Sequence, residues 1–205
     1  MVQHIRPPRV SRRPTLPQTV TDRLPPGQFY TPRWPVLHQG EVPTYDLETW
    51  HLTVFGLVAR PLTLDWPTIA AMPTIEVPGD LHCVTRWSSL DHHWRGIAPT
   101  AIVEATSVMK EARAVMLHGE GGYRANLSLD TFLAPDVVLA THHDGESLSP
   151  AHGAPLRVIV PFRYAWKSVK WLRGIEFLAA DQPGFWEAFG YHNSADPWRE
   201  ERFES

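Results

Sequence analysis

The one cysteine of this chain, Cys83, lies in the segment 79–88, Gly-Asp-Leu-His-Cys-Val-Thr-Arg-Trp-Ser. A thiolate binds soft or high-valent metals well and is also a nucleophile. His82 and Arg86 are close in sequence and favour the thiolate form if they face it. A free cysteine is otherwise commonly a small buried hydrophobic residue, so its role depends on what surrounds it.

A basic and aromatic run occupies residues 162–172, Phe-Arg-Tyr-Ala-Trp-Lys-Ser-Val-Lys-Trp-Leu. Lys167, Ser168 and Lys170 lie within four residues, and such a cluster holds a phosphate through charge and a hydroxyl. The alternative is that the lysines are solvated residues beside a strand while Trp166 and Trp171 fill the core. Taken alone, the lysines favour this second interpretation.

Two histidine-containing segments precede the basic run. His152-Gly153 leads to Arg157, and a turn that offers a histidine, a permissive glycine and an arginine suits an anion. His142-His143-Asp144 contains metal-ligand residue types. Because adjacent strand residues point to opposite faces, both imidazoles rarely bind one ion, and this segment is interpreted as the flank of a turn.

Composition limits the class of protein. The chain has 205 residues, 43% hydrophobic and 20% charged, with a net charge of −3, as in an ordinary globular domain with no global attraction for nucleic acid. One cysteine excludes an internal disulfide and multi-cysteine metal sites. There is no apolar run long enough for a membrane span. Arg12-Arg13 weakly resembles a twin-arginine export signal, but the residues after it are polar, so a cytoplasmic location is expected.

The patterning predicts an α+β domain with mixed sheets and short helices, residues 36–205, after an extended Pro/Arg-rich arm, residues 1–35. Twenty prolines argue against a helical bundle. Short helices are expected at 65–72, with Asp65 as N-cap, at 101–105 and at 128–133. Strands are expected at 51–56, 74–77, 114–118, 123–127, 137–141, 156–160 and 168–177.

Three segments, in this order, resemble the molybdopterin-binding domain of the sulfite oxidase family: 81–88 around Cys83, 152–158 from His152, and 167–172 from Lys167. The resemblance covers about residues 35–180, and the tail is similar to small bacterial members that consist of this domain alone. It implies a molybdenum–molybdopterin cofactor with Cys83 as the protein's sulfur ligand. It also implies contacts to the cofactor from these residues: His152 and Arg157; Lys167, Ser168 and Lys170 with the Ala165 and Trp166 backbone; and, by looser matches, His38, Gln39 and His118.

The sequence departs from sulfite oxidases where they hold their substrate. Ser88 and Leu37 stand where the family has arginines, and the Cys-Val-x-x-Trp-Ser pattern is similar to that of methionine sulfoxide reductase catalytic subunits. Arg86 is the candidate for holding an anionic substrate, and the stretch 86–93 is expected to shape the substrate entrance. The resemblance implies two-electron oxygen-atom transfer on a small oxo-substrate (an S- or N-oxide, or a sulfite-like anion). It also implies electron exchange with a separate protein, either a cytochrome or a haem-bearing membrane subunit.

Two other functions remain open at this point. Cys83 could be the nucleophile of a hydrolase with His152 or His118 as base. The cationic segments could instead form a non-enzymatic module that binds a phosphorylated ligand.

Overall fold

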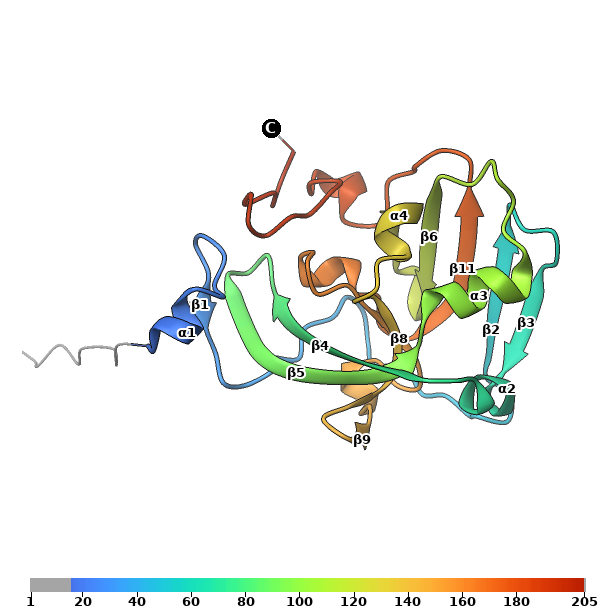
Figure 1. The fold of residues 1–205 in the computed structure, drawn as a ribbon, viewed down its shortest axis with the longest axis horizontal. Coiled ribbons are helices and arrows are strands. Elements are labelled where there is room, and N and C mark those ends of the chain that lie inside the picture. Colours follow the sequence, from blue (N-terminus) through green and yellow to red (C-terminus); the bar gives the residue numbers. More distant parts are fainter. Residues whose placement is uncertain (1–15, 205) are drawn as a thin grey trace, which may run out of the picture.

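The computed structural model describes residues 16–204, in which two β-sheets carry most of the ordered chain. The first sheet has the order β1-β5-β8-β10, with β4 added beside β5 and β9 beside β8; the second has the order β3-β2-β11-β6-β7. Figure 1 shows strands of the second sheet side by side on the right of the molecule. β5 is the long curved strand along the lower left. The protein is an α+β domain with mixed sheets, as predicted.

The strands of the first sheet are β1 (Phe29–Tyr30), β4 (Ile75–His82), β5 (Trp87–Ile97), β8 (Val138–His143), β9 (Glu146–Ser147) and β10 (Arg157–Ile159). Those of the second sheet are β2 (His51–Gly56), β3 (Leu62–Asp65), β6 (Ala114–Gly119), β7 (Arg124–Ser128) and β11 (Leu172–Leu178). The α-helices are α1 (Gln18–Thr21), α2 (Trp66–Ala71), α3 (Pro99–Thr106) and α4 (Leu129–Phe132). Short 3-10 turns span Glu120–Gly122, Pro150–His152, Ala165–Lys167 and Glu187–Phe189.

The predicted elements agree with most of these, and local chemistry explains the helix starts. Asp65 accepts a hydrogen bond from the Thr68 N–H at 2.9 Å, and Ser128 accepts one from the Thr131 N–H at 3.1 Å. Both are N-caps that satisfy an otherwise free backbone donor. Within residues 16–204, no helix combines the length and apolar character needed to cross a membrane.

Two predictions about elements are wrong. The stretch expected as a loop at the substrate entrance is β5, an eleven-residue strand whose buried face includes polar residues such as Ser88 and His92. The last strand begins at Leu172, not at Ser168. Residues 168–171 lie before it without regular structure, and Trp171 has a φ of 52°, which is far from the extended conformation of a regular strand.

The described part of the expected N-terminal arm, residues 16–35, packs on the domain. β1 pairs in parallel with β5. The Arg23 guanidinium donates to Asp80 at 3.0 Å and to Asp91 at 2.7 Å. Trp34 then enters the cavity described below. Residues 1–15 of the predicted arm lie outside the described residues.

One apolar core joins the two sheets. Its members come from the second sheet (Leu52, Leu117, Ile175), from α3 (Ile102) and from β8 and β10 (Leu139, Val158), and all are fully buried. Burial of such side chains contributes roughly 1.5–3 kcal/mol each. The shared core fixes the segments that leave β10 and β11. A second apolar cluster, which includes Val77, Leu81 and Cys83, fixes the turn that leaves β4. These segments carry the candidate site.

Candidate functional site

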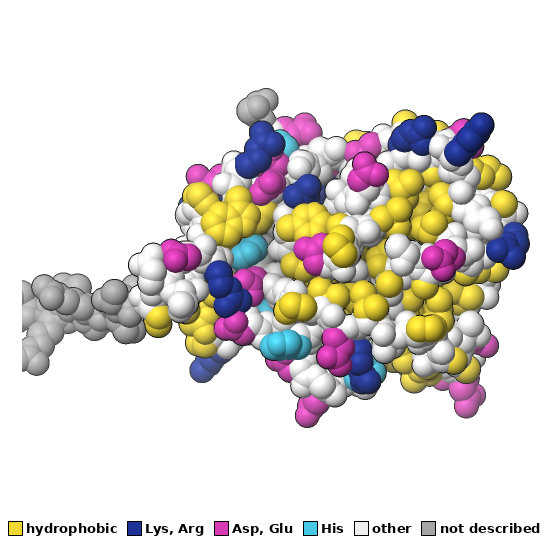
Figure 2. All heavy atoms as spheres, viewed as in Figure 1, with side chains coloured by type: hydrophobic (Ala, Val, Ile, Leu, Met, Phe, Trp, Pro, Cys, Tyr) yellow, Lys and Arg dark blue, Asp and Glu magenta, His cyan; other side chains and the backbone are white. Residues whose placement is uncertain are grey.

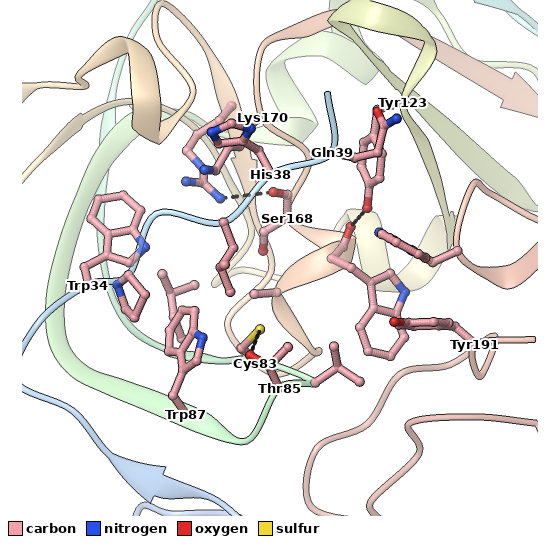
Figure 3. A pocket seen from close by; sticks show the side chains of 18 of the residues that line it. Trp34, His38, Gln39, Cys83, Thr85, Trp87, Tyr123, Ser168, Lys170 and Tyr191 are labelled. Carbon is pink, nitrogen blue, oxygen red and sulfur yellow. Dashed lines mark hydrogen bonds between the residues drawn. The ribbon is translucent and has the colours of Figure 1, made fainter. Parts of the chain in front are cut away.

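A cavity of about 290 Å³ lies between the β4–β5 turn, the segment 34–39 and the segment 165–171, with Trp186 and Tyr191 closing one side. Figure 3 shows Cys83 and Thr85 at one end of this cavity and Lys170 and His38 at the opposite end. The volume is near the lower limit for a site that encloses a small cofactor. The cavity therefore brings together the two segments that the sequence separates by some eighty residues.

The thiol of Cys83 is held by a tight turn between β4 and β5. The Cys83 carbonyl accepts from the Arg86 N–H at 2.9 Å, and the Cys83 N–H donates to the Trp87 carbonyl at 2.8 Å. Arg86 closes the turn with a φ of 77°, a left-handed conformation typical of hairpin turns. Cys83 is 8% exposed, and the Thr85 hydroxyl donates to its Sγ at 3.2 Å.

Burial raises the pKa of the Cys83 thiol, and the hydrogen bonds from Thr85 only partly offset this. The thiol is thus not poised as a free nucleophile. A metal ion that binds the sulfur displaces the proton, so a raised pKa is compatible with ligation.

The opposite end of the cavity holds two cations. The buried Arg157 guanidinium, 2% exposed, donates to the backbone carbonyls of His152 at 2.7 Å and Ser168 at 3.0 Å, and its Nε has no partner within residues 16–204. The Lys170 ammonium donates to the Ala151 carbonyl at 2.8 Å. Burial lowers the pKa of Arg157 to about 9, and burial with the charge of Arg157 lowers that of Lys170 to about 7.

These two cations have no carboxylate partner in the described part of the chain; their hydrogen bonds go to carbonyl oxygens. Buried cations ordinarily have a paired anion, because removing an unpaired charge from water is costly. The Arg157 guanidinium gains some compensation from the Trp34 ring, whose centre is 5.4 Å away. The arrangement is suited to an anionic ligand at this end.

A stacked pair lies beside Arg157. The His152 and Trp34 rings are 3.8 Å apart at an angle of 23°, and of the two it is Trp34 that lines the cavity. His152 Nδ1 lies 3.0 Å from the Ser149 hydroxyl, and its buried Nε2 has no hydrogen-bond partner among the described residues. Burial, followed by the charges of Lys170 and Arg157, lowers the pKa of His152 to about 4, so the imidazole is neutral at pH 7.

The structure places the remaining residues of the predicted set in two groups. Six of them line the cavity: His38, Gln39, Ala165, Trp166, Ser168 and Lys170. Three do not line it, within residues 16–204: Arg86, His118 and Lys167. His152, described above, does not line it either, because its ring lies behind Trp34.

Each of these three side chains lies elsewhere. Arg86 is exposed, and its guanidinium lies close to the backbone of Gly27, outside the cavity. His118 Nε2 is 2.9 Å from Glu176 Oε2 on the neighbouring strand. These placements correct the expectation that Arg86 and His118 face the site.

Lys167 is buried on the far side of the backbone. It is 1% exposed, and its Nζ lies 2.6 Å from Glu187 Oε1 and 2.9 Å from Asn126 Oδ1. Its charge is therefore already neutralised, and its side chain is a structural ion pair. Of the two lysines expected to hold a phosphate, only Lys170 offers its ammonium to the cavity.

Several cavity residues were not predicted from the sequence. The aromatic wall includes Trp34, Tyr123, Trp186 and Tyr191, and the Tyr123 hydroxyl donates to the Trp166 carbonyl at 2.6 Å. The high tryptophan content was the only signal for them. Thr85, two residues after Cys83, could have been found as a hydroxyl beside a candidate metal ligand.

The residues in and around the cavity fit a molybdopterin-held metal. A thiol stands at one end, and two cations without carboxylate partners stand at the other. Buried nitrogen atoms of His152, Arg157 and Trp87 lack hydrogen-bond partners among the described residues. An elongated group with a thiophilic metal and an anionic terminus would suit these features.

Comparison with protein families agrees with this fold and cavity and gives the class of protein, an oxidoreductase domain of the molybdopterin-binding kind. The family model for the oxidoreductase molybdopterin binding domain matches residues 39–186. The chain belongs to this family.

Individual relatives support the same assignment. The chain is 50% identical over 182 residues to the uncharacterized oxidoreductase YuiH of Bacillus subtilis (strain 168), covering 88% of this chain and 92% of that one. It is 25% identical over 175 residues to the protein-methionine-sulfoxide reductase catalytic subunit MsrP of Campylobacter jejuni, covering 75% of this chain and 59% of MsrP. Among solved structures, the sulfane dehydrogenase SoxCD of Paracoccus pantotrophus has the same fold, with a TM-score of 0.65 and 18% identity, covering 70% of this chain and 41% of that chain.

Proposed function

We propose that the chain binds molybdenum–molybdopterin in this cavity and catalyses two-electron oxygen-atom transfer on a small oxo-substrate, with Cys83 as the sulfur ligand from the protein. The observation that carries the proposal is the cavity itself, in which the chain's one thiol faces two cations that lack carboxylate partners in residues 16–204. When bound, the molybdenum would supply the exchange of an oxygen atom and two electrons. Reduction of a sulfoxide consumes two protons and two electrons, and it releases the sulfide and one molecule of water.

The residues of this chain would divide the work between the two ends of the cavity. Lys170 and Arg157 would hold the anionic end of the cofactor, while Ser168 and the backbone of 165–166 would line its path. The Thr85 hydroxyl, which donates to Sγ, would withdraw electron density from the thiolate and tune the potential of the site.

The surroundings of the thiol favour a substrate without net negative charge. The residues that line the cavity near Cys83 include Val84, Thr85 and Trp87, which carry no charge. Arg86, the candidate for an anion, is directed away from the cavity. The Arg202 guanidinium donates to the Val84 carbonyl at 3.0 Å, but it is not among the residues that line the cavity. A neutral S- or N-oxide is therefore a better proposal than sulfite, since a dianion would need a cation that lines this end.

The electrons would come from a separate redox protein. Figure 2 shows positive and negative side chains interspersed on one face of the molecule, in keeping with the net charge of −3. The proposed partner is either a cytochrome or a haem-bearing membrane subunit. Substrate reduction by the purified protein with no added donor would count against it. A cytoplasmic location also remains a prediction, to be checked by cell fractionation.

The geometry gives no support to a cysteine hydrolase. Such an enzyme needs a base within hydrogen-bond reach of the nucleophile. Within residues 16–204, the side-chain hydrogen bond to Sγ comes from Thr85, while His152 is paired with Ser149 and His118 with Glu176. Burial also raises the pKa of the thiol.

The proposal is tested by separating cofactor binding from turnover. Protein purified from a host that makes the cofactor is assayed for pterin content and for dye-linked reduction of a sulfoxide and an N-oxide. Cys83→Ser is expected to retain the pterin and lose turnover, whereas Lys170→Gln is expected to lose most of the pterin. Wild-type turnover in Cys83→Ser would remove Cys83 from its role. A binding module without catalysis would show pterin but no turnover in the wild-type protein.

A further inference from the structure

A second cluster of ligand-type side chains lies outside the thiol cavity, on the other side of Trp34. His92 is in β5, His143 ends β8, and Asp144 begins the turn to β9. Trp94 pairs with His143 in the β5–β8 ladder, so His92, two residues before Trp94, is the diagonal neighbour of His143 on the same face. His142 and His143 point to opposite faces of the sheet, so they cannot bind one ion together. His92 on the neighbouring strand is therefore the second imidazole beside His143.

Three candidate ligand atoms converge in this cluster. His92 Nδ1 lies 2.7 Å from His143 Nε2, and His143 Nε2 lies 3.3 Å from Asp144 Oδ2. One ligand atom from each residue lies within 4.8 Å of the others. Two ligands of a tetrahedral zinc ion, each at about 2.0–2.1 Å, are about 3.3 Å apart. The cluster therefore matches an ion site after a small separation of the two imidazoles.

The same distances are difficult to explain by hydrogen bonds alone. The single proton on His143 Nε2 can serve either His92 Nδ1 or the carboxylate, and if His92 is the donor the carboxylate faces a lone pair. A cation at the centre accepts a lone pair from all three atoms at once.

The carboxylate is held in position by the backbone. Asp144 Oδ1 accepts from the His93 N–H at 3.0 Å, and the Asp144 N–H donates to the His93 carbonyl at 2.8 Å. His92 is 5% exposed, and its other nitrogen, Nε2, has no partner among the described residues. The polar contact of this ring is therefore with the cluster, while Asp144 remains open to solvent.

We propose that His92, His143 and Asp144 form a second metal site that binds one divalent transition-metal ion of the zinc class, with solvent in the open position. Two imidazoles and a carboxylate are the ligand types that such ions prefer, and hard ions such as Mg²⁺ favour oxygen ligands instead. The ion would fasten the β8–β9 turn to β5. It would also steady the wall of the molybdopterin cavity, because the Trp34 ring lies 4.6 Å from His143 and 3.8 Å from His152.

The test is a zinc titration of the full chain by calorimetry after treatment with a chelator. One equivalent is expected to bind, and Asp144→Asn is expected to weaken binding at least about tenfold. Asparagine tolerates the positive φ of 48° at this position, so this variant should fold. His142→Gln, one residue away but outside the cluster, is the matched control and should bind as the wild type does.

The thiol is the competing zinc ligand, and a further variant separates the two. Cys83→Ser should keep the wild-type zinc affinity, and the cobalt(II) derivative of the wild-type protein should show no thiolate charge-transfer band. No zinc binding, equal affinity in Asp144→Asn and His142→Gln, or loss of binding in Cys83→Ser would each overturn the proposal.

Discussion

Replacing Lys170 with methionine tests whether the charge of Lys170 destabilises the folded protein when no anion is bound in the cavity. Burial, followed by the guanidinium of Arg157, lowers the pKa of Lys170 from 10.5 to about 7. The charged form is therefore disfavoured in the folded protein. Methionine is close in length and carries no charge, so it removes this cost while leaving the packing nearly unchanged.

The size of the effect follows from the pKa difference. A shift of about 3.5 units corresponds to about 5 kcal/mol at 1.36 kcal/mol per unit. Because Lys170 is only partly buried, solvent screening reduces this to about 2 kcal/mol. The variant also loses the hydrogen bond to the Ala151 carbonyl, which costs about 1 kcal/mol at every pH.

The sign of the pH dependence is fixed by proton binding. Between about pH 7 and pH 10 the unfolded chain binds a proton at Lys170 that the folded chain does not, so wild-type stability rises with pH in this window. Below pH 7 the full cost is present. Relative to the wild type, Lys170→Met should gain about 1 kcal/mol near pH 6 and lose about 1 kcal/mol above pH 10.

The assay is urea unfolding of cofactor-free protein near pH 6 and above pH 10. At each pH, the free energy of unfolding of the wild type is subtracted from that of Lys170→Met. This difference should fall by about 2 kcal/mol between pH 6 and pH 10. Lys110→Met, at an exposed turn, should show no comparable change. A difference that is the same at both pH values, or that changes in the opposite direction, would refute the account of a charge held under strain.

Two further predictions concern the segments around the cavity. Lys167→Met leaves Glu187 buried without its cation, and urea unfolding should show a loss of about 3–5 kcal/mol; a loss below about 1 kcal/mol would mean that the pair is not structural. Gly153→Ala places a Cβ 3.1 Å from the Lys170 side chain at a φ of 106°, so it should lower both stability, by about 1–3 kcal/mol, and pterin content. Gly145→Ala, at a φ of 85° with nothing within 4 Å, should cost about 1 kcal/mol and keep the pterin content; equal pterin content in the two variants would contradict the crowding argument.

The sequence predicted the fold class and the two ends of the cavity because their residue types are local signals. Strand β2 alternates in the expected way, β6 begins with a continuous buried apolar run, and Asp65 and Ser128 are recognisable caps. β5 was missed because buried polar residues, among them Ser88 and His92, break the apolar pattern. Their partners come from other strands and cannot be read from neighbours in the chain.

The errors in the site have the same origin. Lys167 and Lys170 are close in sequence, but the 3-10 turn at Ala165–Lys167 directs the first ammonium towards Glu187, twenty residues further along. Arg86 adopts a positive φ in the hairpin turn, and its side chain leaves the cavity. Side-chain direction depends on backbone geometry that residue types alone do not specify.

The most direct test of the account is X-ray absorption at the molybdenum edge on protein made in a host that supplies the cofactor. We expect about one molybdenum per chain, with three sulfur neighbours in the wild-type protein and two in Cys83→Ser, the difference being the sulfur of the polypeptide. Protein from such a host that holds no molybdenum, or a metal whose sulfur count is unchanged by the substitution, would contradict it.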